Sequence, residues 1–187
     1  MLHARLLLGK LLNSQNKEPE AEQVLRPLLP VITQVFGAED RTTLLCQSEF
    51  LAALHDQGKD AEAEPQYRRL LPTAVRVFGA EDRDTLRARG CFADLLLKQQ
   101  KVAEAVKEYQ SILSVQERVL GLENQATLGT CYNLALSLQA QHQTAEAQRY
   151  ALRALAGQLK VLGKDHPDTQ ATQQLVDELM KKQAAKH

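Results

Sequence analysis

The chain has 187 residues, and its 23 Lys and Arg balance its 23 Asp and Glu, so the formal net charge is zero. That balance excludes the strongly basic surface typical of nucleic-acid binders and gives no general attraction to anionic membranes. The sequence holds 32 Leu and 24 Ala but only 11 Val and 2 Ile, and it has no Trp. Because Leu and Ala favour helices, whereas β-branched and aromatic residues favour strands, we expect an all-α protein.

The opening stretch, residues 1–12, is rich in Leu but carries His3, Arg5 and Lys10. No small-residue cleavage site follows it, so we predict no signal peptide. No apolar run anywhere reaches the roughly 18 residues that span a bilayer. We therefore expect a cytoplasmic location and no membrane partner.

A 42-residue repeat runs through the chain, and we call each repeating segment a cell. Each repeat carries a glycine that follows two apolar residues, and a threonine stands six residues after the glycine. The glycines are Gly37, Gly79, Gly121 and Gly163, and the threonines are Thr43, Thr85, Thr127 and Thr169. A Glu–Ala pair recurs with the same period, beginning at Glu20, Glu62, Glu104 and Glu146. Periods of this length indicate a repeat architecture in which stacked units share a continuous core.

Each cell predicts two helices. In the second cell, apolar residues at three- and four-residue spacing predict a first helix over 41–57, and after a short turn a second helix over 61–78. The fold class is therefore all-α, an alpha-alpha superhelix of four helix-turn-helix repeats plus a C-terminal capping helix. We predict a single domain over 1–187. Its cells are 1–36, 37–78, 79–120 and 121–162, and the capping helix lies over 163–187.

Polar residues mark the expected helix starts. Asp40, Asp82 and Asn124 precede first helices and suit the N-cap, and Pro167 suits a first helical position. The recurring glycine supplies the left-handed residue that ends each second helix.

Four prolines fall inside the predicted second helices of the first two cells. Each removes a backbone donor and crowds a carbonyl, so we expect kinks or breaks there and straighter helices in the third and fourth cells. Alternatively, these prolines mark the helix ends. They are Pro27, Pro30, Pro65 and Pro72.

No catalytic motif stands out. The sequence lacks a H-E-x-x-H motif, a phosphate-binding glycine loop and a G-x-S-x-G elbow, so we predict no enzyme, no cofactor and no metal. The spacing of Cys46, Cys91 and Cys131 matches no metal motif; free, partly buried thiols are one interpretation and a catalytic thiol is the other. A stack of helix pairs offers an open inner face rather than a closed pocket, which favours binding a peptide or protein.

The cell resembles the kinesin light chain class of tetratricopeptide repeats. Residues 161–169 (VLGKDHPDT) are similar to its inter-repeat loop, and residues 58–65 (GKDAEAEP) to the start of its second helix. The resemblance implies recognition of a peptide or protein on the inner face. In that class repeated asparagines line this face, but here the equivalent column holds only Asn133, so motor-type cargo recognition is not carried over. That column reads Leu7, Glu49, Cys91, Asn133 and Leu175.

Alignment to the family's cell predicts the side chains that line the inner face. Arg87 and Lys98 are suited to bind carboxylates or carbonyls, and Tyr132 offers area with a polar tip. The alternative is that these are ordinary solvated residues. The predicted partner-binding residues are Lys10, Asn13, Ser48, His55, Asp56, Arg87, Asp94, Lys98, Tyr132, Asn133 and Gln139.

The first helix is more apolar than its counterparts, with Leu6 and Leu7 at positions that are mostly polar in other cells. Terminal repeats usually have a polar outer face. We therefore expect this end to be covered, either by an upstream segment or by a second copy of the chain. Two functions thus stay open: a protein-interaction module, and a regulatory or self-associating segment of a larger signalling protein.

Overall fold

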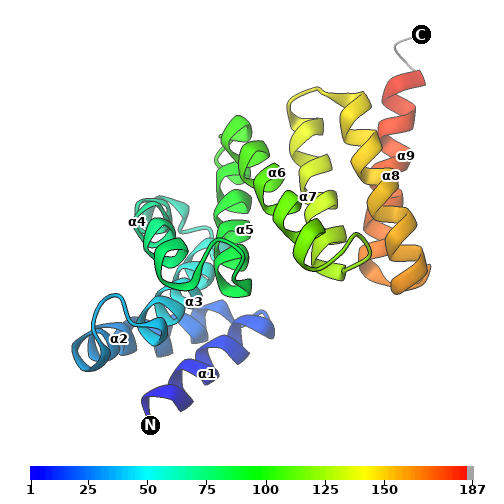
Figure 1. Ribbon diagram of the computed structural model, residues 1–187. Helices are drawn as coiled ribbons and strands as arrows, with labels where there is room; N and C mark the ends of the chain where they lie inside the picture. The colour runs from blue at the N-terminus through cyan, green and yellow to red at the C-terminus, as the bar shows by residue number, and fades with distance from the viewer. Residues whose placement is uncertain (185–187) are drawn as a thin grey trace. The chain divides into compact units, whose positions relative to one another are not determined.

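A computed structural model describes residues 1–184, and over that range the backbone forms nine α-helices and no β-strand (Figure 1). Four helix pairs, from α1–α2 to α7–α8, are followed by the single helix α9, which confirms the predicted all-α, helix-pair fold. The final residues of the predicted capping segment, 185–187, lie outside the described range. The helices are α1 (Leu2–Ser14), α2 (Glu18–Phe36), α3 (Arg41–Asp56), α4 (Asp60–Phe78), α5 (Arg83–Lys98), α6 (Val102–Val119), α7 (Gln125–Ala140), α8 (Thr144–Val161) and α9 (Pro167–Ala184).

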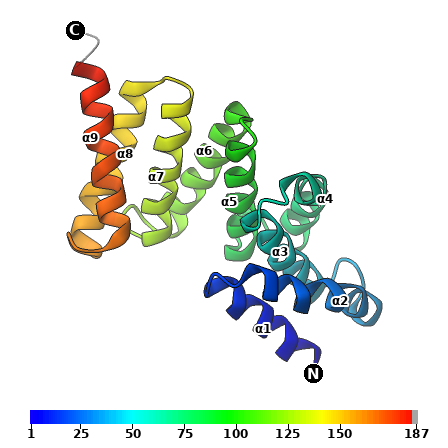
Figure 2. The same cartoon turned by 180° about the vertical axis from the view of Figure 1, so that it is seen from behind.

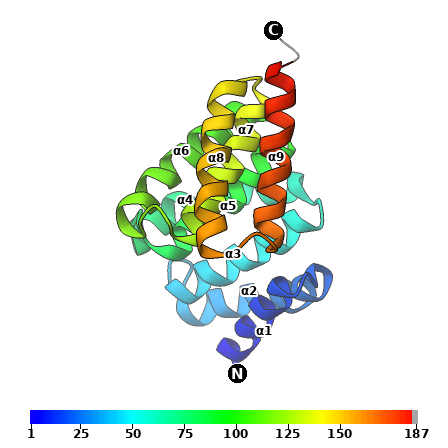
Figure 3. The ribbon, with the colours of Figure 1, turned by 90° about the vertical axis from the view of Figure 1, so that its right-hand side faces the viewer.

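Backbone contacts divide the chain into a first unit, Met1–Leu95, and a second unit, Leu96–His187, with the boundary inside α5. In the first unit, α1 packs on α2 and α3, and α3 packs on α2 and α4. In the second unit, α7 packs on α6, α8 and α9, and α8 and α9 lie side by side (Figures 2 and 3). Each unit stacks its helix pairs in chain order; the single array over 1–187 stays a prediction.

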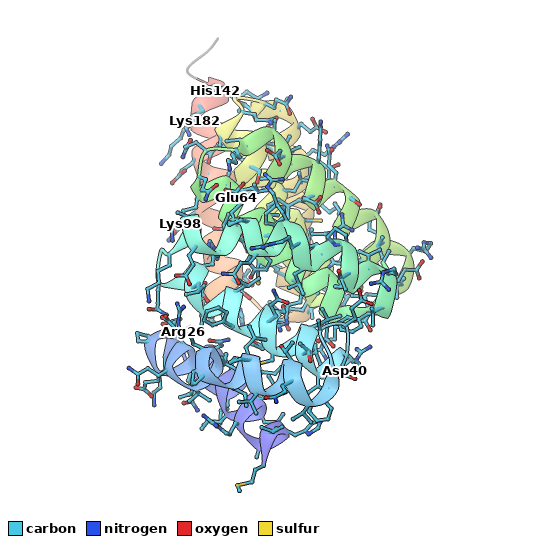
Figure 4. The ribbon with its side chains drawn as sticks, turned by 90° about the vertical axis from the view of Figure 1, so that its left-hand side faces the viewer. Arg26, Asp40, Glu64, Lys98, His142 and Lys182 are labelled. Carbon is cyan, nitrogen blue, oxygen red and sulfur yellow. The ribbon has the colours of Figure 1, made fainter. Side chains whose placement is uncertain are left out.

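The predicted N-caps are confirmed. The Asp40 side chain, labelled in Figure 4, accepts a hydrogen bond from the backbone N–H of Thr42 at 2.7 Å. Asn124 accepts in the same way from Ala126 at 2.9 Å, and Asp82 accepts from Asp84 at 2.9 Å. These bonds satisfy N–H groups that a helix start leaves without an intrahelical partner.

The recurring glycines have the positive φ that the sequence predicted, between 85° and 98°. At Gly37 and Gly79, however, ψ is 159° and 156°, which lies far from the left-handed helical region. That combination is essentially restricted to glycine. The hydroxyl of Thr43 donates to the Gly37 carbonyl oxygen at 2.7 Å, which explains the six-residue spacing in the second cell.

The predicted breaks at the prolines are wrong, because α2 and α4 run without interruption past Pro27, Pro30, Pro65 and Pro72. All four prolines lie on exposed positions of their helices. A carbonyl that loses its intrahelical donor on that side can bond to water instead, so the helix tolerates the proline.

The core repeats with the same period. The alanine that follows each recurring glutamate is fully buried, and four residues later stands a second buried side chain. The first column is Ala21, Ala63, Ala105 and Ala147, each 0% exposed; the second is Leu25, Tyr67, Tyr109 and Ala151, each at most 1% exposed. Each large side chain in this column stabilises the fold by about 1.5–3 kcal/mol through burial. Among the described residues no helix is long and apolar enough to cross a membrane.

Candidate functional site

The first helices of the first unit bring polar side chains together around one carboxylate, that of Glu49. Glu49 lies on α3 and is only 2% exposed. From α1, the Asn13 amide donates to the Glu49 carbonyl oxygen at 3.0 Å and to its Oε2 at 3.1 Å. From α5, the Arg87 guanidinium donates to both carboxylate oxygens. Lys10 Nζ of α1 lies 3.9 Å from Oε1. We call these residues the Glu49 cluster.

Charge neutralisation explains why a carboxylate can be buried here. An isolated buried carboxylate is strongly unfavourable, whereas a paired and hydrogen-bonded one is tolerated. Burial by itself would lower the pKa of the Arg87 guanidinium, but the Glu49 carboxylate outweighs that effect, and the pKa is raised. Arg87 therefore stays charged and fixes the spacing of α3 and α5.

The predicted contacts Lys10 and Asn13 of α1 and Arg87 of α5 thus come together around Glu49 of α3. Two further predicted residues, Asp56 and Asp94, lie close enough to Cys91 of α5 to act on its thiol electrostatically. The first helices of the first unit therefore carry both signs of charge near one another. Their roles in binding stay predictions.

Two predicted contacts are not on the surface. Ser48 is 6% exposed and His55 is 9% exposed. The His55 ring lies with Nδ1 2.6 Å from Oδ1 of Asp60, the first residue of α4. That pairing holds the ring against the start of α4. Little of either side chain is left for a partner to contact.

The remaining predicted contacts belong to the second unit. Lys98 is exposed at the end of α5, and Tyr132, Asn133 and Gln139 are half-buried on α7. Burial raises the pKa of the Tyr132 phenol, and the carboxylates of Glu178 and Asp168 raise it further. The phenol therefore lies near the acidic side chains of α9. This surface can offer hydrogen bonds and aromatic area.

The thiols are unsuited to nucleophilic chemistry. Burial raises the pKa of Cys46 to about 12, and burial raises the pKa values of Cys91 and Cys131 to about 11. All three are therefore protonated at neutral pH, and a nucleophile must be a thiolate. No group of three or more His, Cys, Asp or Glu that could hold a metal ion occurs within residues 1–184.

Three surface hollows lie away from the Glu49 cluster. One, of about 390 Å³, is lined by α6 and α8 side chains that include Glu117 and Arg153. Another, of about 420 Å³, lies between α2 and the α3–α4 turn, beside Arg26, which is labelled in Figure 4. The third, of about 510 Å³, lies beside the α7–α8 turn and Gln183. All three are open to solvent.

Sequence reasoning missed the centre of the site. In the sequence, Glu49 stands out only as a departure from the asparagine column, and nothing links it to Lys10, Asn13 or Arg87. The signal that could have found it is the glutamate itself: its position is Leu, Cys, Asn or Leu in the other cells. A lone charge in such a column requires a countercharge from a neighbouring helix.

The comparisons with known proteins agree with this architecture. The tetratricopeptide repeat family model matches residues 52–84 and 127–168. A search of curated proteins finds no significant match.

Solved structures with a similar fold extend over nearly the whole chain. A protein described as a kinesin light chain from Podosopora anserina, with nearly identical TPR-like repeats, has a TM-score of 0.82 and 21% identity, covering 98% of this chain and 87% of its own. BtubC (BKLC) from P. vanneervenii has a TM-score of 0.72 and 19% identity, covering 95% and 78%. The apo form of RapI has a TM-score of 0.77 and 14% identity, covering 98% and 64%. At these identities the likeness establishes the fold.

Proposed function

We propose that this chain, a tetratricopeptide repeat protein with the fold of the kinesin light chain-like class, binds a peptide or protein on the inner face of its first helices and catalyses no reaction. The observation that carries the proposal is the Glu49 cluster, which joins three consecutive first helices on one face. Repeat arrays use extended surfaces of this kind for binding. The neutral thiols support the absence of covalent chemistry.

The ligand chemistry follows from the charges at the edge of the cluster. The Lys10 side chain is 54% exposed and only loosely paired with Glu49. Asp56 is exposed on the next first helix. A partner that presents an acidic group to Lys10 and a basic group to Asp56 matches both, and such complementarity gives specificity and faster association. We propose the cytoplasm as the compartment, since the three cysteines are free and long-lived disulfides belong to oxidising compartments.

Affinity capture with the full chain tests this function. The wild type, Lys10→Ala and Asp56→Asn are used as baits, and bound proteins are quantified by mass spectrometry. The matched control is Arg69→Ala, which removes an exposed charge from the second helix α4. We expect a partner set that is retained by the control and reduced at least about tenfold by the first-helix variants, a difference of about 1.4 kcal/mol. Equal recovery with every bait would refute binding on the inner face.

A second candidate function is that of a regulatory or self-associating segment of a larger signalling protein. The observation in its favour is apolar exposure on α1, where Leu7 is 65% exposed. Leu6, the other residue predicted to self-associate, is only 8% exposed and belongs to the core. Sedimentation of the full chain over a hundredfold range of concentration tests this candidate; a mass that stays monomeric contradicts self-association.

A further inference from the structure

One side of α1 is apolar and uncovered in the part of the chain that the structure describes. Leu7, Leu8 and Leu11 are 65%, 46% and 52% exposed. Val31 of α2 is 42% exposed. Isolated exposed leucines need no explanation, but three of them within five residues of one helix form a continuous apolar row. We call Leu7, Leu8, Leu11, Gln15 and Lys17 the α1 end face.

The repeat provides an internal control for this exposure. The residues one, two, three and four cells after Leu8 and Leu11 are all buried. For Leu8 they are Phe50, Phe92, Leu134 and Val176, between 0% and 5% exposed. For Leu11 they are Ala53, Leu95, Ser137 and Leu179, each 0% exposed. Within residues 1–184, the α1 end face therefore has the pattern of a repeat interface without the element that covers it in the later cells.

The covering element at the equivalent position is a second helix. The Arg26 guanidinium of α2 lies 4.9 Å from the centre of the Phe50 ring. One cell later, Arg68 of α4 lies 5.3 Å from the centre of the Phe92 ring. The preceding second helix thus covers this column twice in the first unit. A helix with an apolar stripe is what fits over Leu8 and Leu11.

A polar contact accompanies the same packing. Glu22 of α2 accepts hydrogen bonds from Gln57 Nε2 at 2.7 Å and from Lys59 Nζ at 2.5 Å. The Lys59 ammonium, with help from Arg26 and Gln57, lowers the pKa of Glu22 to about 2. Gln57 and Lys59 therefore clamp a carboxylate of the preceding second helix.

The same clamp stands at the α1 end face. Gln15 and Lys17 occupy the positions one cell before Gln57 and Lys59, with the same residue types. Both are exposed. Within residues 1–184, neither side chain forms a hydrogen bond or an ion pair. Gln15 and Lys17 can therefore bind a carboxylate of another helix beside the apolar row.

We propose that the α1 end face binds an amphipathic helix of a partner protein, whose apolar side chains cover Leu8 and Leu11 and whose glutamate is bound by Gln15 and Lys17. The helix takes the place that α2 has on α3. This surface is separate from the inner face, so the proposal does not depend on the proposed function. It defines the partner by chemistry: a helix with one apolar stripe and a carboxylate near its first turn.

A second copy of the chain fits this face less well. The only charged or titratable side chains on α1 are His3, Arg5 and Lys10. Two α1 end faces placed together would bring Lys17 and the basic side chains of α1 together without a countercharge. Like charges brought together are unfavourable, and a partner of opposite sign is favoured.

The carboxylates of the second helices are also already occupied. At the position of Glu22, the other second helices have Glu64, Val106 and Gln148. Glu22 is held by Lys59, and Glu64 accepts from Arg68 at 3.0 Å. A second copy therefore has no spare glutamate on this column to offer to Gln15 and Lys17.

The probe for the test is a fluorescent peptide with the sequence of α2, residues 18–36, in which Pro27 and Pro30 are changed to Ala so that it is helical in isolation. Both prolines are exposed in α2, away from the packed stripe. Titration with the full chain is followed by fluorescence anisotropy. We expect saturable binding, weakened about tenfold by Leu8→Glu and severalfold by Lys17→Ala.

The controls separate this face from general stickiness. Leu152→Glu places the same charge on another exposed leucine, of α8, which is 44% exposed and should leave binding unchanged. A Glu22→Gln peptide should lose the effect of Lys17→Ala, since both changes remove the same ion pair. Circular dichroism verifies that each variant is folded.

Three results would overturn the proposal. The first is peptide affinity that is equal for the wild type and Leu8→Glu. The second is absence of binding at about 100 μM chain, well above the micromolar range of specific helix recognition. The third is a dimer in sedimentation that Leu8→Glu abolishes while the peptide fails to bind, which assigns the face to a second copy.

Discussion

Removing Arg87 should destabilise the protein more than its partial exposure suggests, because it leaves the Glu49 carboxylate buried beside weaker partners. Breaking a fully buried pair costs about 3–5 kcal/mol. Arg87 is 36% exposed while Glu49 is 2% exposed, and Lys10 remains 3.9 Å from the carboxylate. Solvent screening therefore reduces the expected loss for Arg87→Met to about 2–3 kcal/mol. The midpoint of thermal unfolding should fall by about 5–10 °C.

Removing both charges should restore most of that stability. The equivalent of Glu49 is Leu7 or Leu175 in two other cells, so Glu49→Leu places a residue that the repeat already uses there. We expect the double variant Glu49→Leu with Arg87→Met to lie within about 1 kcal/mol of the wild type, since a buried pair and an apolar replacement are often equivalent. Urea unfolding followed by circular dichroism measures the free energy of unfolding of the wild type, the two single variants and the double variant.

A second ion pair provides the matched control. Arg153 and Glu117 pair between α8 and α6, with side chains 33% and 31% exposed. Because both side chains are partly exposed to solvent, Arg153→Met should lower the free energy of unfolding by less than about 1 kcal/mol. If Arg87→Met costs no more than Arg153→Met, burial of the Glu49 carboxylate does not decide the outcome and the reasoning is refuted.

Three further predictions concern pH, backbone and thiols. The pKa of Glu22 falls from 4.5 to about 2 on folding, so the stabilisation that its carboxylate provides is complete above about pH 4.5 and is lost as the pH falls toward 2. Glu22→Gln should therefore lower the free energy of unfolding by about 1–2 kcal/mol at pH 7 and by little at pH 2, as measured by urea titrations at both pH values. Gly79→Ala should lower the free energy of unfolding by about 1–3 kcal/mol, because φ is 98° and ψ is 156° at Gly79. Gly90 lies inside α5 with open space around it, so Gly90→Ala should raise the free energy of unfolding by about 0.5–1 kcal/mol. A loss of equal size in both variants would contradict the backbone argument. Cys46 and Cys131 should react with a thiol reagent at pH 7.5 only after urea unfolds the chain, because both are 0% exposed; rapid labelling of the native protein would contradict their burial.

The repeat made the fold predictable from sequence. The N-caps at Asp40 and Asn124 and the start of α9 at Pro167 all follow from local chemistry that is repeated in register. Local chemistry predicts breaks at the prolines that the helices do not have, because the periodicity of a helix does not show which of its sides faces water. That information comes from packing against neighbouring helices.

The site was predictable only in part. Three of the proposed contacts, Lys10, Asn13 and Arg87, do meet on one face, because alignment of cells places equivalent positions on equivalent helix sides. Glu49 and His55 depend on pairs that join different helices, Glu49 with Arg87 and His55 with Asp60. One sequence without structure does not reveal such pairs, since the partners are 38 and 5 residues apart with no fixed pattern.

The contacts of Arg26 with Phe50 and of Arg68 with Phe92 carry a consequence for how such a chain can change length. The two contacts are one period apart, so the α2–α3 and α4–α5 junctions both pair an arginine of the second helix with a phenylalanine of the next first helix. Excising residues 37–78 would join Arg26 to Phe92 across an interface of an existing type. Gain or loss of this one period therefore needs no new kind of interface at the junction where it occurs.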